Sequence, residues 1–314
     1  MSAPVAAIDC GTNSIRLLIA RWDEETGRLV DLERRMEIVR LGYGVDRTGR
    51  LDPEAVSRTL AATREYAELI AHHGAHDIRF VATSATRDAS NREDFLDGVR
   101  EILGIEVEVV PGDEEAELSF RGAVSTLPEL PPGRRLVVDI GGGSTELVLG
   151  QDVPTHRISL DIGSVRLTER HLHSDPPTES EIDAARTDVD AQLDAASLAV
   201  PLDQVEQLVG VAGTVTTLTG VALGAVQYTP DLSHGAEIPA VTMLEHCEAV
   251  LRMTRSERGS LSIIHPGRID VIGAGALIWE RIIRRVMDVT PVTRTWTSEH
   301  DILDGIALSL LDRG

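Results

Sequence analysis

Two stretches of the chain share one order of apolar and small polar positions. Residues 5–20 read VAAIDCGTNSIRLLIA and residues 136–150 read LVVDIGGGSTELVLG. In each, an apolar run ends in Asp, a turn of small residues follows, and a second apolar run begins. This pattern predicts a strand–turn–strand hairpin, and such a glycine turn presents backbone N–H groups that bind anions, phosphate above all. A glycine turn can be no more than a turn, but Asp9 aligns with Asp139 and the two copies match. We therefore expect two related domains, each with a phosphate turn.

Between and after these hairpins, strand-like and helix-like patterns alternate. The expected strands are 28–36, 78–82, 105–110, 155–160, 207–212 and 292–296, and the expected helices are 53–74, 91–104, 163–171, 178–197, 242–254, 266–287 and 301–312. Such a mixture in two similar halves indicates an α/β fold, whose ligands bind at the carboxyl ends of strands. A third glycine turn is expected at 213–218, at the start of a helix.

The stretch 125–135 contains three prolines and predicts a crossover between domains. Domain I is therefore expected over 1–124 and domain II over 125–300, with an active-site cleft between them. The C-terminal helix, about 301–314, is expected to pack back on domain I.

The charge of the chain narrows its possible partners. The net charge of −21 argues against nucleic-acid and membrane-surface binding. The sequence contains no lysine, so all 30 basic residues are Arg, which excludes a Walker P-loop and Schiff-base chemistry. The chain has no long apolar run, and Cys10 and Cys247 lie far apart, so we expect free thiols and a cytoplasmic protein. An anionic substrate would have to be bound by Arg side chains, backbone amides and a divalent cation.

Four polar residues flank the two matched turns. Asp9 and Asp139 end apolar strands beside turns suited to phosphate, and a bound Mg²⁺ or a water network would explain a carboxylate there. Each Asp could instead cap its own turn. Arg16 and Glu146 occupy the same offset in the two copies, which suggests that one turn clamps phosphate while the other handles metal or water. Arg16 could also be a solvated strand residue.

Other candidate residues lie outside the hairpins. Glu114 and Glu115 begin a helix, where acidic residues are ordinary partners of the helix dipole. Arg87 lies in a polar loop, 83–91, after a strand. Arg268 is expected to open a helix, where a cation needs a partner. The histidines show no metal-binding framework such as HExxH.

Several strings together resemble the exopolyphosphatase/guanosine-pentaphosphate phosphohydrolase family, whose members have two ribonuclease-H-like domains of the actin and sugar-kinase superfamily. The matching strings are AIDCGTNSIRLLIA (7–20), RLGYGV (40–45), VATSATRDASN (81–91), PGDEEAELSFRG (111–122), VVDIGGGSTELVLG (137–150), GVAGTVTTL (210–218), LSHG (232–235), HPGRIDVIGAGALI (265–278) and SEHDILDGIAL (298–308). They are collinear and cover nearly the whole chain.

The resemblance implies hydrolysis of a terminal phosphoryl group from inorganic polyphosphate, from the guanosine pentaphosphate alarmone, or from both. It implies that Glu115 is the general base, that Glu146 is the second catalytic carboxylate near a metal, and that Arg16 and Arg268 bind phosphate. The turns and the resemblance together give the expected phosphate-binding residues: Gly11, Thr12, Asn13, Ser14, Arg16, Arg87, Gly141, Gly142, Gly143, Ser144, Thr145, Gly213, Thr214 and Arg268. The expected metal, Mg²⁺ or Mn²⁺, would be held by Asp139 and Glu146, with Asp9 as a further candidate, and a monovalent cation is also considered.

Two departures from the family pattern matter. The chain stops at Gly314 without the HD-type domain of longer members, so we expect short polyphosphate to be preferred. The last motif reads Ser298-Glu299 and Asp304-Gly305 where the family has Ser-Asp and Glu-Gly, which could alter a hinge.

Three alternatives remain at this point. The same chemistry could act on the alarmone, the protein could bind guanosine penta- or tetraphosphate without hydrolysing it, or it could be a sugar or acetate kinase. The retained carboxylates oppose the second alternative and the EEA string opposes the third. A homodimer is expected.

Overall fold

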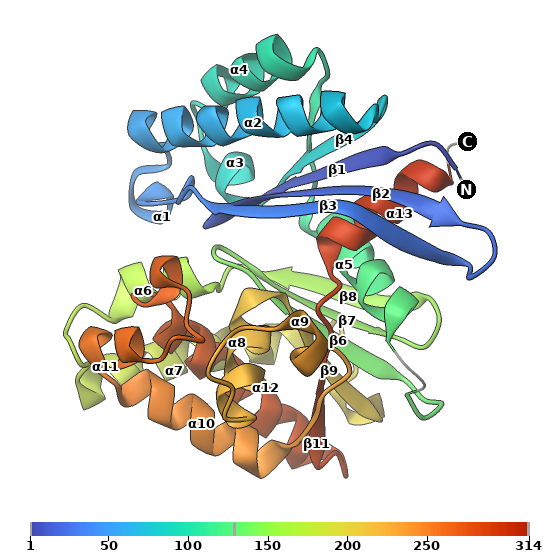
Figure 1. Cartoon of the computed structure of the whole chain (residues 1–314). Coiled ribbons are helices and arrows are strands. Elements are labelled where there is room, and N and C mark those ends of the chain that lie inside the picture. Colours follow the sequence, from blue (N-terminus) through green and yellow to red (C-terminus); the bar gives the residue numbers. More distant parts are fainter. Residues whose placement is uncertain (1, 128–129, 313–314) are drawn as a thin grey trace. The chain divides into compact units, whose positions relative to one another are not determined.

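The computed structural model describes residues 2–127 and 130–312. Contacts divide the chain into two compact units: unit 1 is Met1–Gly122 with Ile302–Gly314, and unit 2 is Ala123–Asp301. Each unit is built on one mixed sheet with helices packed against it (Figure 1). The two-domain α/β fold predicted from the sequence is confirmed.

Unit 1 has a five-stranded sheet in the order β3-β2-β1-β4-β5. Its strands are β1 (Val5–Cys10), β2 (Ser14–Asp23), β3 (Arg28–Ile38), β4 (Asp77–Ala82) and β5 (Val107–Val109), and its helices are α1 (Val45–Thr48), α2 (Pro53–His73), α3 (Ser84–Asp88), α4 (Glu93–Leu103), α5 (Gly112–Thr126, whose last turn is counted with unit 2) and α13 (Ile302–Leu311). The β1–β2 and β2–β3 pairs are antiparallel, whereas β1–β4 and β4–β5 are parallel.

Both faces of this sheet are covered, which explains why its central strands are apolar at almost every position. Ile8 on β1 and Leu17 on β2 belong to a core that α2 and α4 complete, while Ala7 and Leu18 point to the face covered by α13. The covering helices are seen on opposite sides of the sheet in Figure 1. Alternate strand residues face opposite ways, so burial on both faces requires continuous apolar runs.

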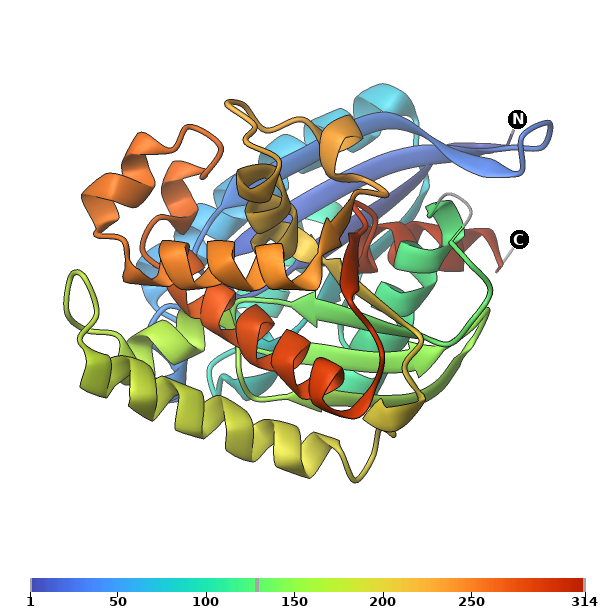
Figure 2. The ribbon, with the colours of Figure 1, turned by 90° about the horizontal axis from the view of Figure 1, so that it is seen from below.

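Unit 2 has a six-stranded sheet in the order β10-β11-β9-β6-β7-β8. Its strands are β6 (Arg135–Ile140), β7 (Thr145–Gly150), β8 (Pro154–Leu160), β9 (Gln207–Val211), β10 (Glu237–Pro239) and β11 (Arg294–Thr297). Its helices are α6 (Ser164–His171), α7 (Glu179–Ala196), α8 (Ala212–Ala222), α9 (Pro230–Ser233), α10 (Ala240–Arg252), α11 (Arg255–Ser260) and α12 (Ile272–Val289), with 3₁₀ turns η1 (Leu202–Gln204) and η2 (Pro266–Arg268). Figure 2 shows α10 and α12 running side by side, and the core of the unit gathers around the buried α12.

The prediction that a helix begins at residue 266 was wrong. Residues Pro266–Arg268 form the 3₁₀ turn η2, and α12 begins only at Ile272. The His265 side chain accepts the Gly267 N–H at 3.1 Å, which closes a separate short turn before the helix. Arg268 therefore lies in a turn and does not open the helix.

The segment 83–91 also differs from the expectation. Residues Ser84–Asp88 form the short helix α3 rather than a loop. Asn91, where a helix was expected to begin, lies before α4 and is bonded to Leu51: Oδ1 accepts the Leu51 N–H at 2.8 Å and Nδ2 donates to the Leu51 carbonyl at 3.1 Å. The residue at the cap position is Arg92, whose side chain makes no capping bond.

None of the helices in the described segments combines the length and the apolar character that crossing a membrane would need.

Candidate active site

In unit 1, three segments that carry predicted site residues begin at one edge of the sheet. The parallel strands β1, β4 and β5 are in register, with Cys10 opposite Ala82 and Ala82 opposite Val109. Their carboxyl ends therefore lie side by side, at the edge where α/β sheets bind ligands. The turn 11–14 follows β1, α3 follows β4, and α5 follows β5.

The turn 11–14 is fixed by hydrogen bonds to its carbonyl groups. The Asn13 carbonyl accepts two N–H groups from residues 39–40, at 3.1 and 2.9 Å, and the Thr12 carbonyl accepts the Gly42 N–H at 2.8 Å. A Cβ atom on Gly42 would lie 2.3 Å from the Thr12 methyl carbon, so this approach requires glycine. The Thr12 hydroxyl is hydrogen-bonded to Ser84 at 2.9 Å, which links the turn to α3.

Asp9 and Arg16 face each other directly across the β1–β2 pair. Nε and the terminal NH2 of Arg16 donate to one Asp9 oxygen at 2.9 and 2.6 Å, and Asp9 is only 5% exposed. The residue expected to bind phosphate and the further candidate for metal are thus one ion pair. Arg16 supplies a positive charge to Asp9, so a metal ion is not needed to explain this carboxylate.

Glu115 and Arg87 form the second ion pair of this edge. Arg87 NH1 donates to Glu115 Oε2 at 3.0 Å and to the Val110 carbonyl at 2.9 Å. Glu115 is 7% exposed, so its carboxylate is buried beside the Arg87 guanidinium. Its neighbour Glu114 points elsewhere and accepts from Arg79 at 2.6 Å. Sequence reasoning assigned Arg87 to phosphate and did not foresee that it holds Glu115.

Unit 2 repeats the arrangement with different chemistry. β6 and β9 are parallel neighbours with Asp139 opposite Val211, so the turn 141–144 and the start of α8 emerge at one edge of the sheet. Within the β6–β7 hairpin, Asp139 faces Glu146. The position that holds an arginine in unit 1 thus holds a second carboxylate here.

The turn 141–144 is anchored through its carbonyl groups to the start of α6. The carbonyls of Gly141 and Gly142 accept the N–H groups of residues 164–166 at 2.8–3.1 Å, and the Gly143 carbonyl accepts Arg166 Nε at 2.7 Å. In a trans peptide the N–H points opposite to the C=O, so the N–H groups of residues 142–144 point away from α6. Within the described residues, these three amides donate no hydrogen bond. They form the kind of amide nest that binds anions.

The two carboxylates beside this nest are buried. Asp139 is 6% exposed and Glu146 is 1% exposed, and Ser159 donates to Glu146 Oε1 at 2.7 Å. Like charges that face each other across a strand pair repel. A bound cation would relieve this repulsion, and Mg²⁺ prefers one or two carboxylates with phosphate and water oxygens. No group of three or more His, Cys, Asp or Glu side chains suited to a metal is found in the described part of the chain, which is compatible with that preference.

Residues 213–218, expected as a third glycine turn, lie inside α8, and the first residue of that helix has a strained backbone. Ala212 has a φ of 62°, a left-handed value that is costly for a residue with a side chain. Arg268 NH1 donates to the Gly213 carbonyl at 2.9 Å, and a Cβ atom on Gly213 would lie 1.9 Å from the Arg268 guanidinium carbon. The structure thus brings together two residues predicted separately, a guanidinium and a helix N-terminus, which both attract anions.

The sequence analysis did not identify four residues that shape these two sheet edges: Gly42, Ser84, Ser159 and Gly163. Ser84 stood inside a string that carried the family resemblance, and its hydroxyl beside other polar residues could have marked it. Gly163 shows no local pattern, because its importance comes from the turn 141–144 lying against it: a Cβ atom there would be 2.4 Å from the Gly142 oxygen.

Both cysteines are free, buried thiols. Burial raises the pKa of Cys10 well above its ordinary value, and the nearby Asp9 charge acts in the same direction. Burial likewise raises the pKa of Cys247. Protonated, buried thiols are poor nucleophiles, so neither is a candidate for catalysis.

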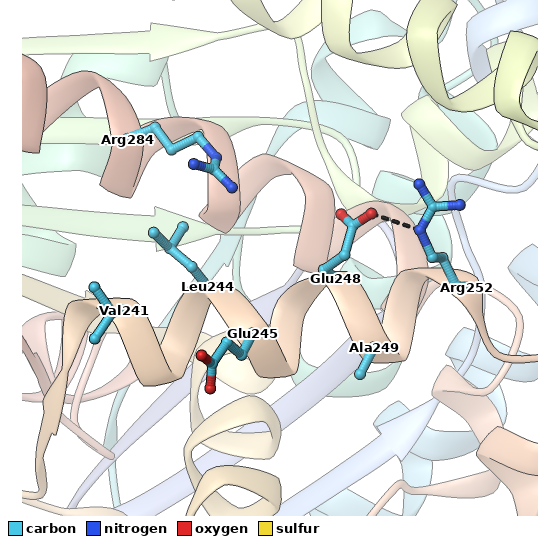
Figure 3. A pocket seen from close by; sticks show the side chains of 7 residues that line it. All are labelled: Val241, Leu244, Glu245, Glu248, Ala249, Arg252 and Arg284. Atoms are coloured by element: carbon cyan, nitrogen blue, oxygen red, sulfur yellow. Dashed lines mark hydrogen bonds and ion pairs between the residues drawn. The ribbon is translucent and has the colours of Figure 1, made fainter.

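A pocket of about 580 Å³ lies over α10 and α12 (Figure 3), and none of its lining residues was predicted for the site. It is lined by Val241, Leu244, Glu245, Glu248, Ala249, Arg252 and Arg284, and Glu248 is paired with Arg252 one turn further along α10. Ion-paired side chains on helix faces make a solvated surface rather than a phosphate site.

Comparison with known proteins decides the family. The model of the Ppx/GppA phosphatase family matches residues 18–310. The chain belongs to the Ppx/GppA phosphatase family. It is 49% identical over 313 residues to exopolyphosphatase 2 of Mycobacterium tuberculosis, with 98% of each chain covered.

Solved members of the Ppx/GppA family have the same fold. The crystal structure of an exopolyphosphatase-like protein matches with a TM-score of 0.94 at 45% identity, covering 99% of both chains. The Ppx/GppA enzyme of Aquifex aeolicus matches with a TM-score of 0.80 at 32% identity, covering 98% of this chain and 99% of that one. The family resemblance carried by the sequence motifs is confirmed.

Proposed function

We propose that this Ppx/GppA phosphatase hydrolyses the terminal phosphoanhydride bond of inorganic polyphosphate. The observation that carries the proposal is the amide nest of residues 142–144 beside the buried Asp139–Glu146 pair. The exopolyphosphatase name of a relative at 49% identity supports it. The nest supplies donors for phosphate oxygens, and the paired carboxylates supply the ligands that a phosphate-bound cation needs.

In unit 2, the N–H groups of residues 142–144 hold phosphoryl oxygens, and Arg268 with the N-terminus of α8 binds a further phosphoryl group. Asp139 and Glu146 fit Mg²⁺ or Mn²⁺ as two oxygen donors, directly or through water. When bound, the ion neutralises negative charge on the phosphate oxygens.

In unit 1, Glu115 is the general base. It takes a proton from water while the water oxygen attacks the terminal phosphorus, and the bond from that phosphorus to the bridging oxygen breaks. The shortened chain leaves with the electron pair, and the terminal unit is released as inorganic phosphate. Arg87 pairs with Glu115 and holds it in place between the β5–α5 turn and α3. Positioning of this kind supplies most of the catalysis of phosphoryl transfer, and the base adds about 10²–10⁴-fold.

The net charge of −21 disfavours the accumulation of a long polyanion on the protein, so short chains are the preferred substrates. Guanosine penta- and tetraphosphate are proposed as further ligands. An exposed aromatic ring supports this: Tyr228 is 42% exposed, its hydroxyl donates to Glu299, and Arg268 lies in its electrostatic environment. A guanine base could stack on such a ring while Arg268 meets the phosphates. We also propose a cytoplasmic homodimer.

The test is phosphate release from tripolyphosphate, long polyphosphate and guanosine pentaphosphate, measured side by side with Mg²⁺. The wild type should act fastest on tripolyphosphate. Glu115→Gln should lose about 10²-fold or more in kcat while its KM is unchanged or lower. Glu117→Gln, an exposed change on the same helix, is the matched control and should behave as wild type. Near-normal turnover by Glu115→Gln would refute the assignment of the base. Phosphate release from the pentaphosphate alone would refute the proposed substrate.

A further inference from the structure

Arg258 on α11 is a buried cation with few partners. The residue is only 5% exposed, and its Nε atom is buried without a hydrogen-bond partner. Within residues 2–127 and 130–312, its guanidinium makes no hydrogen bond, and the contact that it does make is an ion pair at 3.9 Å from NH2 to Asp175. Burying a charged group without hydrogen bonds costs several kcal/mol, so a further partner is expected.

The nearby carboxylate satisfies this charge only in part. Asp175 Oδ1 already accepts the backbone N–H of Arg255 at 2.8 Å, and its side chain is 36% exposed. Burial lowers the pKa of the Arg258 guanidinium, and the positive charge of Arg255 lowers it further. The negative charges of Asp175 and Asp270 act in the opposite direction. Arg258 and Arg255 thus share this region with two carboxylates, and Arg258 itself is left with one ion pair, to Asp175 at 3.9 Å, among the described residues.

The guanidinium faces the beginning of α12. A Cβ atom on Gly273, the second residue of α12, would lie 3.0 Å from Arg258 NH1. The residue before the helix, Val271, provides no side-chain cap for the first N–H groups. The N-terminus of this 18-residue helix carries a partial positive charge. Two positive groups thus meet at a glycine, where backbone and guanidinium can approach the same small ligand.

We propose that Arg258 and the first turn of α12 form a second anion site, which takes a tetrahedral phosphoryl group. Arginine matches phosphate oxygens with paired hydrogen bonds, and helix N-termini bind phosphate through backbone N–H groups. The site is made of residues other than the amide nest 142–144 and Arg268. Its ligand is either free inorganic phosphate, the product of the reaction, or one unit of a polyphosphate chain.

Equilibrium dialysis of the full-length protein against labelled orthophosphate, at ionic strength held constant with NaCl, measures the number of phosphates bound per chain. Arg258→Met keeps the apolar stem and removes the charge, and it should bind one phosphate fewer than wild type. The matched control Arg255→Met removes the neighbouring charge and should keep the wild-type number. A second arm repeats the measurement with tripolyphosphate in a Glu115→Gln background, in which turnover is slowed by about 10²-fold or more. If Arg258→Met binds one orthophosphate fewer than wild type, the site takes the product. If the variant binds less only in the tripolyphosphate arm, the site takes one unit of the polymer. An unchanged number in both arms overturns the proposal.

Thermal unfolding separates this role from a structural one. Without phosphate, Arg258→Met should melt at the wild-type temperature or above, because it removes a poorly paired buried charge. Added orthophosphate should raise the Tm of wild type more than that of the variant. Gly273→Ala, whose methyl group would crowd the guanidinium, should also lose one bound phosphate. A variant that melts well below wild type and keeps the full phosphate-dependent rise in Tm would show that Arg258 serves only the fold.

Discussion

Replacing Gly163 by alanine should deform the amide nest without touching a charged residue. The new Cβ atom would lie 2.4 Å from the Gly142 oxygen and 2.6 Å from the Gly143 nitrogen. Contacts below 3.0 Å are essentially never seen for real Cβ atoms, so the Gly142 oxygen would have to retreat by about 0.6 Å. The φ of Gly163 is −153°, which any residue adopts. The effect is therefore steric, and it falls on the turn 141–144.

The size of the effect follows from this displacement. A shift of about 1 Å in groups that position a substrate costs roughly 10²-fold in rate, so a shift of about 0.6 Å should lower kcat/KM by roughly 10-fold or more. Overpacking should also lower the free energy of unfolding by about 1–3 kcal/mol. The two effects are separable, because the activity is measured well below the melting temperature.

The assay is phosphate release from tripolyphosphate at a temperature where circular dichroism shows both proteins folded. Gly259→Ala is the matched control: its Cβ atom would meet only the flexible end of Ile269, at 3.4 Å, so its kcat/KM should stay within about two-fold of wild type. A folded Gly163→Ala protein with wild-type kcat/KM would refute the idea that the N–H groups of residues 142–144 hold the substrate.

Three further changes test other parts of the site. Glu146→Gln should lower activity and shift the Mg²⁺ titration to higher concentrations, whereas an unchanged midpoint would remove Glu146 from the metal site. Arg268→Ala should weaken substrate binding by roughly 10–100-fold, the equivalent of about 1.5–3 kcal/mol, while the half-buried control Arg92→Ala leaves KM unchanged. Burial raises the pKa of Glu299 above its ordinary value of 4.5, although two hydroxyl groups that donate to it act in the opposite direction. Its contribution to stability is then present at low pH and is lost as the pH rises through the folded-state pKa. The Tm of Glu299→Gln minus that of wild type should therefore increase from about pH 4 to about pH 7, and a flat difference would contradict the raised pKa.

Much of the site could be predicted because its key groups are local in the sequence. An apolar run, an Asp and a glycine turn specify a hairpin whose ends lie at a sheet edge, so both matched turns and their aspartates were found. The opposition of Asp9 to Arg16 and of Asp139 to Glu146 follows from hairpin register, which the equal offsets in the two copies already indicated.

Partners that come from distant segments could not be predicted. The pairing of Arg87 with Glu115 depends on β4 and β5 being parallel neighbours, and that of Arg268 with Gly213 depends on how the turn before α12 folds back. Glycine and arginine in these strings are compatible with many contacts, so the sequence pattern does not select one of them.

The sequence by itself determined the α/β class, the family and the two matched glycine turns, because each depends on hydrophobic periodicity or on residues adjacent in the chain. Only the tertiary structure decided which way the turn amides point and which cation meets which carboxylate. It also placed the Arg258 guanidinium against the start of α12, with a weak ion pair to Asp175. These outcomes depend on packing between segments far apart in sequence, where sterics at a few glycines and the cost of burying charge select one arrangement among many.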